Sequence, residues 1–406
     1  MIIMDVKLNH VYGFDDFHMN FTYPRKLAVD IIGDETLEGR ERFRYKKAVI
    51  LMGTNATGKT SLGRALLKIF SSVKEANEAI LRELDHTGTP AQFQVDFVNE
   101  GYTLHRFAGT VDGENVSTRY YTAEIAEMDS YEMAVEKLID RTDEIGGSFK
   151  ALRKAVGSLE FRFAYPEIET SLRVGGVEKA ALLKTLRAVI GTLDPTLNDV
   201  SIAKDLKDSF VIRRRGKEII IQDGKLLNRE LLSSGTAEGI DVAVFLASML
   251  SYKNCFYYCD EHFSYIQSDI EKNIFGLMVE RLGRNEQLIF TTHNTDMLDL
   301  NLPKHAFAFL RKEIDDGEYN VTVTFASEFL KRNTDSVKCA MENDVFQSLP
   351  DTSLLDELDQ GGEWSCETIT SKTRKYGRRR LSLSMKNGSS WMSMEKRSRK
   401  ARFVSA

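Results

Sequence analysis

Residues 46–73 read KKAVILMGTNATGKTSLGRALLKIFSSV, and this stretch decides the fold. The continuous apolar run Ala48–Met52 predicts a buried strand, and apolar residues at helical spacing after Thr60 predict an amphipathic helix. Between them, Gly53–Thr60 fits the pattern G-x-x-x-x-G-K-[ST] without a mismatch. This order predicts a site in which backbone N–H groups and the helix N-terminus face phosphate oxygens.

The side chains of this loop have distinct tasks at such a site. Lys59 would neutralise charge on the β- and γ-phosphates, and Thr60 would offer a hydroxyl group to Mg²⁺. An ordinary glycine-rich turn is the alternative interpretation, but the strand before the loop and the helix after it argue against that. The candidate nucleotide-binding residues are Gly53, Asn55, Gly58, Lys59, Thr60 and Ser61.

A second element, Phe256–Glu261, reads FYYCDE. A buried strand that ends in two carboxylates places the first beside Mg²⁺ and the second where an attacking water would sit. Strands often end in solvated acids, so the pair alone is a weak signal. Downstream of a phosphate loop, it predicts Asp260 as a metal ligand and Glu261 as a catalytic residue.

Two further segments lie at helix and strand ends. Leu232–Thr236 reads LSSGT before a helix, where free N–H groups could bind an anion through Ser234 and Gly235. An ordinary N-cap at Ser233 or Ser234 explains the same pattern.

The fourth segment, Thr291–Asn294, reads TTHN and follows the strand Gln287–Thr291. A lone histidine is more often packed or exposed without a role. However, His293 comes one strand after the acid pair, which is where a sensor of the γ-phosphate would lie.

The chain divides into five parts by pattern. Residues 1–119, with the phosphate loop, and 206–330, with the LSSGT segment, the acid pair and His293, are predicted to be two ATPase lobes, and strands that alternate with helices from Phe210 to Phe325 predict a parallel α/β sheet. Helical patterns in 120–205 predict an insertion between them. Residues 331–370 are predicted to be helical and acidic, and 371–406 form a basic tail that is predicted to be disordered.

Composition limits the class of protein. With 406 residues, 42% hydrophobic, 28% charged and six prolines, the chain is expected to be globular. Its apolar stretches fall short of the roughly 20 residues that span a bilayer, so no membrane partner is expected. Four scattered cysteines predict no disulfide framework and favour a cytoplasmic location.

The four elements in this order resemble those of the ATP-binding-cassette (ABC) ATPase family: phosphate loop, LSGGQ-like signature, acid pair and switch histidine. The resemblance is strongest to the soluble branch of the SMC, RecF and overcoming-lysogenisation-defect proteins, in which a helical insertion splits the cassette. Residues 291–300, TTHNTDMLDL, look like the THN segment of ATPases from bacterial anti-phage defence operons. The resemblance covers roughly residues 1–330.

This resemblance implies an α/β P-loop NTPase fold of ABC type, split by the insertion at 120–205, that binds and hydrolyses ATP with Mg²⁺. It also implies a homodimer or higher oligomer in which ATP is sandwiched between two heads. Lys59 and Asp260 of one head would then face Ser234 and Gly235 of the other.

The sequence departs from the family pattern in several places. The signature has Ser234 in place of its first glycine and Thr236 in place of its glutamine. Gln92 and Gln94 are both candidates for the glutamine that lines the metal site, and the choice stays open. The insertion is too short for a long SMC coiled coil. About 80 residues follow Ala326 without the acidic cluster of a TOPRIM nuclease, so a nuclease would be a separate chain.

The sequence therefore predicts a cytoplasmic ATPase that serves as the switch or motor subunit of an anti-phage defence complex. It would dimerise around ATP and control a separate effector protein, either a nuclease or a toxin. The alternative is a RecF- or SMC-like ATPase of DNA maintenance or repair that clamps DNA. A transporter subunit is disfavoured because such a cassette needs no insertion as long as 120–205.

Charge is distributed unevenly along the chain. Residues 371–406 carry +11 and the preceding 370 residues carry −16, within a net charge of −5. The tail could be a solvated segment, a site for nucleic acid or a reading-frame scar, and the acidic run Asp351–Asp359 could fold back on it.

If the tail binds nucleic acid, the affinity should be electrostatic and independent of base sequence. Deleting residues 371–406 should weaken binding at about 50 mM salt by orders of magnitude. ATP hydrolysis without nucleic acid should stay unchanged, because no candidate site residue lies in the tail. Filter binding and phosphate release measure the two effects. Retained binding with lost hydrolysis would contradict the prediction.

Overall fold

The structure is a computed structural model that describes residues 1–24, 31–85, 88–99, 101–165, 177–197, 199–203, 209–214, 217–222, 225–227, 229–315, 318–332, 334–350 and 352. Residues 1–350 form one compact unit. The predictions for the basic tail and for the acidic run before it concern residues that, apart from Thr352, lie outside the described part.

A six-stranded sheet carries the phosphate loop and the acid pair. Its first five strands are parallel and the last is antiparallel, so the predicted parallel α/β sheet is confirmed in part, as a mixed sheet. Its strands Ala48–Met52, Cys255–Asp260 and Gln287–Thr291 are buried along their whole length, which explains their apolar runs. In order across the sheet, the strands are β10 (Glu160–Ala164), β15 (Cys255–Asp260), β16 (Gln287–Thr291), β5 (Ala48–Met52), β17 (Phe307–Asp315) and β18 (Glu318–Phe325).

The other sheets are antiparallel. The larger one has the order β2 (Phe17–Asn20), β1 (Ile2–Asn9), β6 (Ala91–Val98), β7 (Thr103–Asp112), β8 (Asn115–Glu124) and β9 (Ile139–Asp140). A smaller sheet contains β11 (Asp199–Ile202), β12 (Ser209–Arg214), β13 (Lys217–Gln222) and β14 (Lys225–Leu227), and β3 (Thr36–Leu37) pairs with β4 (Arg40–Arg44).

Nine α-helices are found in the described residues. They are α1 (Lys59–Lys74), α2 (Tyr131–Glu136), α3 (Thr142–Ile145), α4 (Phe149–Val156), α5 (Lys179–Leu193), α6 (Ser234–Ser251), α7 (Ser268–Arg281), α8 (Ala326–Phe329) and α9 (Val337–Glu342). None of the helices in these ranges is long and apolar enough to cross a bilayer.

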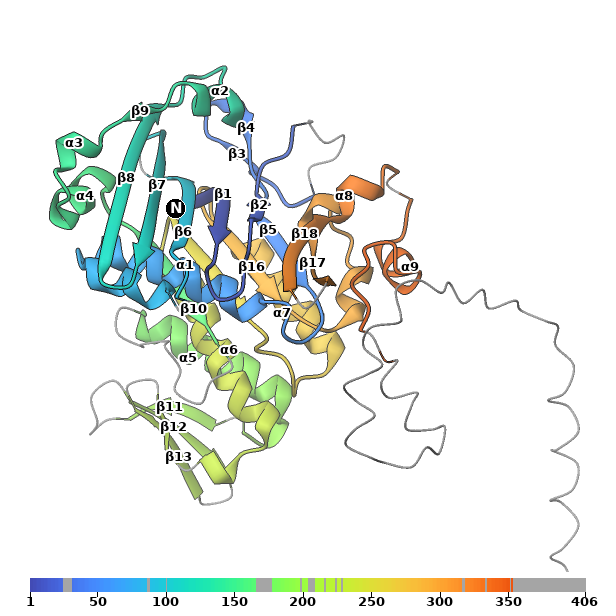
Figure 1. Ribbon diagram of the computed structural model, residues 1–406. Coiled ribbons are helices and arrows are strands. Elements are labelled where there is room, and N and C mark those ends of the chain that lie inside the picture. The colour runs from blue at the N-terminus through green and yellow to red at the C-terminus, as the bar shows by residue number, and fades with distance from the viewer. Residues whose placement is uncertain are drawn as a thin grey trace, which may run out of the picture. The chain divides into compact units, whose positions relative to one another are not determined.

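Helix α1 is packed between the two large sheets (Figure 1). Its apolar face, with Leu62, Leu66 and Phe70, contacts the inner face of β1 and β6 and one face of the parallel sheet. The opposite face of the parallel sheet packs against α5, α6 and α7. The phosphate loop is therefore held at the end of a strand that is buried on both sides.

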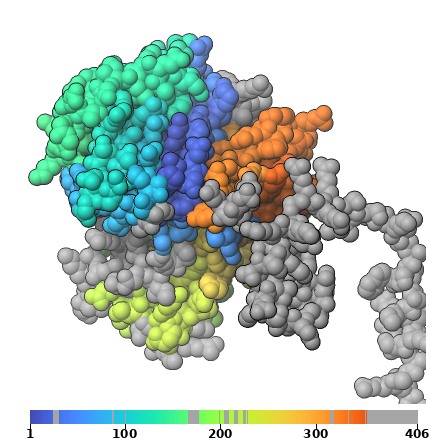
Figure 2. Space-filling model, in the orientation of Figure 1, coloured from blue at the N-terminus to red at the C-terminus, as the bar shows by residue number. Residues whose placement is uncertain are grey.

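Segments far apart in sequence meet on one face of the molecule. Figure 2 shows the N-terminal strands (blue) between the β6–β8 region (teal) and the β17–β18 hairpin (orange). The turn between β1 and β2 consequently lies near the phosphate loop, where the side chain of Phe14 contacts Gly58.

The predicted helical insertion at 120–205 is not confirmed. Helices α2 to α5 lie in this range, but β8 runs to Glu124 and β10 at Glu160–Ala164 belongs to the parallel sheet beside β15. Phe161 and Phe163 are buried in the core against α1. Burial of these two aromatic side chains places the segment in the sheet, although helical patterns surround it on both sides.

Helix α1 approaches β15 closely at one glycine. A Cβ atom at Gly63 would lie 2.6 Å from Cε1 of Tyr258, whereas a Cβ atom at Gly276 in α7 would meet nothing within 4 Å. Tyr258 also donates a hydrogen bond to the carbonyl oxygen of Lys59.

This contrast predicts opposite effects of the same substitution. Gly63→Ala should lower the free energy of unfolding by about 1–3 kcal/mol, because the added methyl group overpacks a buried contact. Gly276→Ala should raise it by up to about 1 kcal/mol, because alanine favours a helix more than glycine does. Guanidinium unfolding curves measure both values, and a Gly63→Ala protein as stable as the wild type would refute the close contact.

Candidate functional site

The phosphate loop connects the end of β5 at Met52 with the start of α1 at Lys59. Gly58 has a φ of 98°, and a Cβ atom there would lie 2.8 Å from Cζ of Phe14. Both the left-handed backbone and the lack of space require glycine at this position. The loop is closed by Thr57, whose hydroxyl group donates to the carbonyl oxygen of Thr54 at 2.8 Å.

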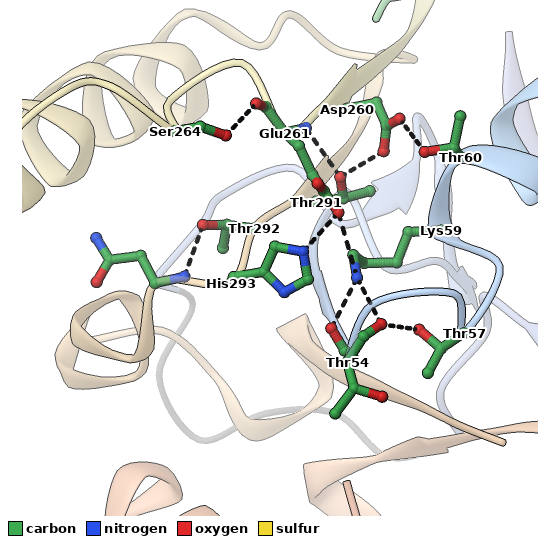
Figure 3. Close-up of polar contacts among 12 residues, drawn as sticks. Thr54, Thr57, Lys59, Thr60, Asp260, Glu261, Ser264, Thr291, Thr292 and His293 are labelled. Atoms are coloured by element: carbon green, nitrogen blue, oxygen red, sulfur yellow. Dashed lines mark hydrogen bonds and ion pairs between the residues drawn. The ribbon is translucent and has the colours of Figure 1, made fainter. Parts of the chain in front are cut away.

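The ammonium group of Lys59 is held inside this loop (Figure 3). Its Nζ atom donates to the carbonyl oxygens of Gly53 at 2.7 Å and Thr54 at 3.1 Å, and lies 3.2 Å from Oε1 of Glu261. Burial lowers the pKa of Lys59, and the charge of Glu261 opposes that shift. A buried lysine with these partners is placed to meet a phosphate group.

The carboxylate of Asp260 connects three elements at the end of β15. Its Oδ2 atom accepts a hydrogen bond from Thr60 of α1, and its Oδ1 atom accepts one from Thr291 of β16, both at 2.6 Å. Burial raises the pKa of Asp260, and the hydrogen bonds from the two hydroxyl groups oppose that shift. The sequence predicted Thr60 and Asp260 as partners but missed Thr291.

The donor set at Asp260 fits magnesium. Mg²⁺ prefers oxygen ligands and usually takes one or two carboxylates together with substrate phosphates and water. The Asp260 carboxylate and the Thr60 hydroxyl group supply such oxygens at the phosphate loop. Within the described residues, no group of three or more His, Cys, Asp or Glu side chains could hold a metal.

Glu261 lies between the lysine and the histidine. Its Oε1 atom is 2.9 Å from Nε2 of His293 as well as 3.2 Å from Nζ of Lys59. The hydrogen bond from His293 and the charge of Lys59 lower the pKa of Glu261. Its backbone has a φ of 48° and is fixed by hydrogen bonds from its N–H to the carbonyl and hydroxyl oxygens of Thr291. The residue is thus an oriented, ionised carboxylate.

The loop that carries His293 is anchored by a buried acid on α7. Glu271 is 2% exposed, and its two carboxylate oxygens accept hydrogen bonds from Thr292 at 2.7 Å and Asn294 at 2.6 Å. Burial raises the pKa of Glu271. Nothing in the local sequence distinguishes Glu271 from an exposed helix residue, so the sequence could not predict this support.

One cavity of about 330 Å³ joins the phosphate loop to residues that the sequence did not predict. Asn55, Gly58, Lys59, Thr60, Ser61 and Glu261 line one part of it, and Tyr12, Phe14, Lys312 and Tyr319 line another. The Nζ atom of Lys312 lies 3.8 Å from the centre of the Tyr319 ring. These residues come from the β1–β2 turn and the β17–β18 hairpin, and long-range contacts alone bring them to the site.

The candidates Gly53, Asp260 and His293 do not line this cavity themselves but contact Lys59, Thr60 and Glu261, which do. Ser234 and the glutamines Gln92 and Gln94 also lie outside the lining. Both glutamines are on β6 of the antiparallel sheet. Ser234 is exposed at the start of α6, where Ser233 is the N-cap and accepts a hydrogen bond from the N–H of Thr236.

Gly235 is also absent from the cavity lining. A Cβ atom on Gly235 would lie 2.5 Å from the carbonyl oxygen of Tyr265. Ser234 and Gly235 therefore form a capped helix start that is separate from the chain's own phosphate loop.

No family model matches the chain, and no curated protein matches it. Among solved structures, it is similar to an Smc head bound to the C-winged helix domain of ScpA, with 12% identity, a TM-score of 0.47 and coverage of 81% of this chain and 100% of that one. The SMC head domain from Thermotoga maritima is 14% identical, with a TM-score of 0.39 and coverage of 79% and 98%.

A third structure is an Smc head domain with an extended coiled coil, bound to the C-terminal domain of ScpA derived from Pyrococcus furiosus. It is 12% identical, with a TM-score of 0.46, and the match covers 88% of this chain and 99% of the third structure. At these scores the likeness carries no argument about activity, which rests on the geometry of the site.

The contact between His293 and Glu261 predicts a measurable pKa change. In the wild type, the pKa of Glu261 should lie below its ordinary value of 4.5. His293→Ala removes the largest cause of that shift, so the pKa should rise. Carbon-13 NMR of labelled glutamate carboxyl groups measures it, with Glu261→Gln to assign the signal.

His10→Ala is the matched control, because His10 pairs with Asp15 and does not line the cavity. It should leave the pKa of Glu261 unchanged. An equal pKa in the wild type and in His293→Ala would mean that the two side chains do not interact in solution.

Proposed function

We propose that this chain is an ATPase of ABC type that hydrolyses ATP with Mg²⁺. The observation that carries the proposal is the convergence of side chains from the carboxyl ends of three neighbouring parallel strands. Lys59 and Thr60 follow β5, Asp260 ends β15 with Glu261 directly after it, and His293 follows β16. Ligand sites of open α/β sheets lie at this edge.

Each residue has a role in phosphoryl transfer to water. The loop N–H groups and Lys59 would bind the β- and γ-phosphates. Thr60 and Asp260 would hold Mg²⁺, which supplies charge neutralisation at the phosphates when bound. Because Lys59 is 3.2 Å from Glu261, phosphate oxygens would compete with Glu261 for the ammonium group.

Glu261 is then available to the attacking water. Its carboxylate would orient the water and accept its proton. His293 would keep the carboxylate ionised through the 2.9 Å contact with Oε1, and would itself lie near the γ-phosphate. Thr291 fixes the backbone of Glu261 and also contacts Asp260, so metal binding and water orientation depend on the same residue.

The proposal includes a dimer closed around ATP. Ser234 is exposed at the N-terminus of the 18-residue helix α6 and does not line the cavity of its own chain. A helix N-terminus attracts anions through its free N–H groups and dipole. Both features support contact of Ser234 and Gly235 with the nucleotide of a second head, in a homodimer or higher oligomer.

In the cell, we propose that the ATPase is a switch or motor subunit of a bacterial anti-phage defence complex with a separate nuclease or toxin as effector. This proposal rests on the resemblance of residues 291–300 to ATPases of defence operons. The alternative is an SMC- or RecF-like ATPase that clamps DNA. Affinity purification of the chain with ATP and Mg²⁺ distinguishes them: a bound nuclease or toxin supports defence, whereas bound DNA without such a protein supports maintenance.

Substituting Glu261 should separate ATP binding from hydrolysis. Glu261→Gln should bind ATP as the wild type does, lose at least about 100-fold in turnover, and accumulate as an ATP-bound dimer, because the general base is lost while the phosphate site remains. Lys59→Ala should instead lose ATP affinity. Calorimetry, phosphate release and light scattering measure the three properties.

The proposed contact of Ser234 with the nucleotide of a second head has its own control. Adding Ser234→Arg to Glu261→Gln should abolish the ATP-dependent dimer without lowering the ATP affinity of a single head, because arginine would obstruct the exposed helix start. If the mass of the protein is the same with and without ATP in both variants, the LSSGT segment is only a capped helix start. Wild-type turnover in Glu261→Gln would assign the base elsewhere.

A further inference from the structure

The segment that follows Glu261 is held by a glutamate on another element. Glu238 lies in α6, one turn after the exposed Ser234. Its Oε1 atom accepts a hydrogen bond from the N–H of Ser264 at 3.2 Å, and its Oε2 atom accepts one from the N–H of Tyr265 at 2.9 Å. Both carboxylate oxygens are therefore used on two successive backbone N–H groups.

A second contact joins the same two segments. Gly235 is so close to the carbonyl oxygen of Tyr265 that an added Cβ atom would lie 2.5 Å from it. The hydroxyl group of Ser264 in turn donates to the carbonyl oxygen of Glu261 at 3.2 Å. Contacts thus lead from the first turn of α6, through Ser264 and Tyr265, to the backbone of Glu261.

The backbone of Glu261 needs such support. Its φ of 48° is unfavourable for a residue with a side chain, and conformations of this kind persist only where surrounding contacts fix them. Thr291 fixes the N–H side of Glu261. The contacts of Glu238 and Ser264 fix the carbonyl oxygen of Glu261 and the backbone after it.

We propose that Glu238 is a positioning residue that couples the N-terminus of α6 to the carboxylate of Glu261. The proposal rests on the function proposed above, in which Ser234 contacts the nucleotide of a second head and Glu261 orients the water. A displacement of the α6 N-terminus then moves Glu261 as well. Closure of the dimer around ATP would then also bring the carboxylate of Glu261 into position for the attacking water.

The charge on Glu238 is part of this role. Burial raises the pKa of Glu238, and the two backbone N–H groups favour the ionised form. An ionised carboxylate accepts hydrogen bonds from both backbone N–H groups. A carboxamide can accept through its oxygen only, and its N–H₂ group would face the other backbone N–H, which is also a donor. Glu238→Gln thus keeps the size of the side chain and removes one of the two hydrogen bonds.

Kinetics of the full chain test the coupling. In Glu238→Gln, kcat for ATP hydrolysis should fall on the order of 10- to 100-fold, because misplacement of a catalytic group by about 1 Å has such effects. The KM for ATP and the Tm should stay unchanged. The matched control is Glu230→Gln, which removes the same charge from an exposed site before α6 and should hydrolyse ATP normally.

Two further readouts separate coupling from general damage. Hydrogen exchange of residues 261–267 should be faster in Glu238→Gln than in Glu230→Gln. The ATP-dependent dimer should still form in Glu238→Gln, because Ser234 is intact, whereas Ser234→Arg should lose it. Loss of kcat with an intact dimer and faster exchange supports the proposal.

Other outcomes overturn it. A Glu238→Gln protein with wild-type kcat would show that Glu261 does not depend on Glu238, even if exchange is faster. An equal loss of kcat, ATP affinity and Tm would mean a structural role only. If the wild type itself fails to hydrolyse ATP, the proposed ATPase function fails, and that outcome is recognised before any variant is compared.

Discussion

The buried carboxylate of Asp260 is the interaction on which the site depends. A carboxylate with 0% exposure is costly unless its oxygens are hydrogen-bonded, and here hydroxyl groups from α1 and β16 satisfy one oxygen each. The carboxylate therefore binds the phosphate loop, the acid pair and the strand before His293 to one another. Loss of this group would disconnect the proposed metal site from the residues that are proposed to act on water.

Much of this arrangement could be predicted from local sequence. The pattern Gly53–Thr60 needs only neighbouring residues to specify a strand, loop and helix, and the apolar run before Asp260 marks a buried strand end. Parallel strands then bring these ends to one edge of the sheet. The expected partners Lys59, Thr60, Asp260, Glu261 and His293 accordingly lie together.

The parts that could not be predicted depend on long-range contacts. Glu271 and Glu238 are acidic residues in helices, and only the tertiary structure shows that they accept hydrogen bonds from the loops that follow strand β16 and Glu261. Tyr12 and Lys312 reach the cavity from segments that lie far apart in the sequence. Strand β10 was missed because Phe161 and Phe163 form a short alternating pattern between helical segments, and their burial against α1 is what selects a strand.

The position of β16 between β5 and β15 sets the dimensions of the site. Two inter-strand spacings of about 4.8 Å each separate the strand with the phosphate loop from the strand with the acid pair. Register fixes Thr291 opposite both Leu51 and Asp260. A slip of one residue would turn Thr291 to the other face of the sheet. The middle strand therefore sets the distance between the phosphate loop and the acid pair, and an insertion or deletion within Gln287–Thr291 would change the register on both sides at once.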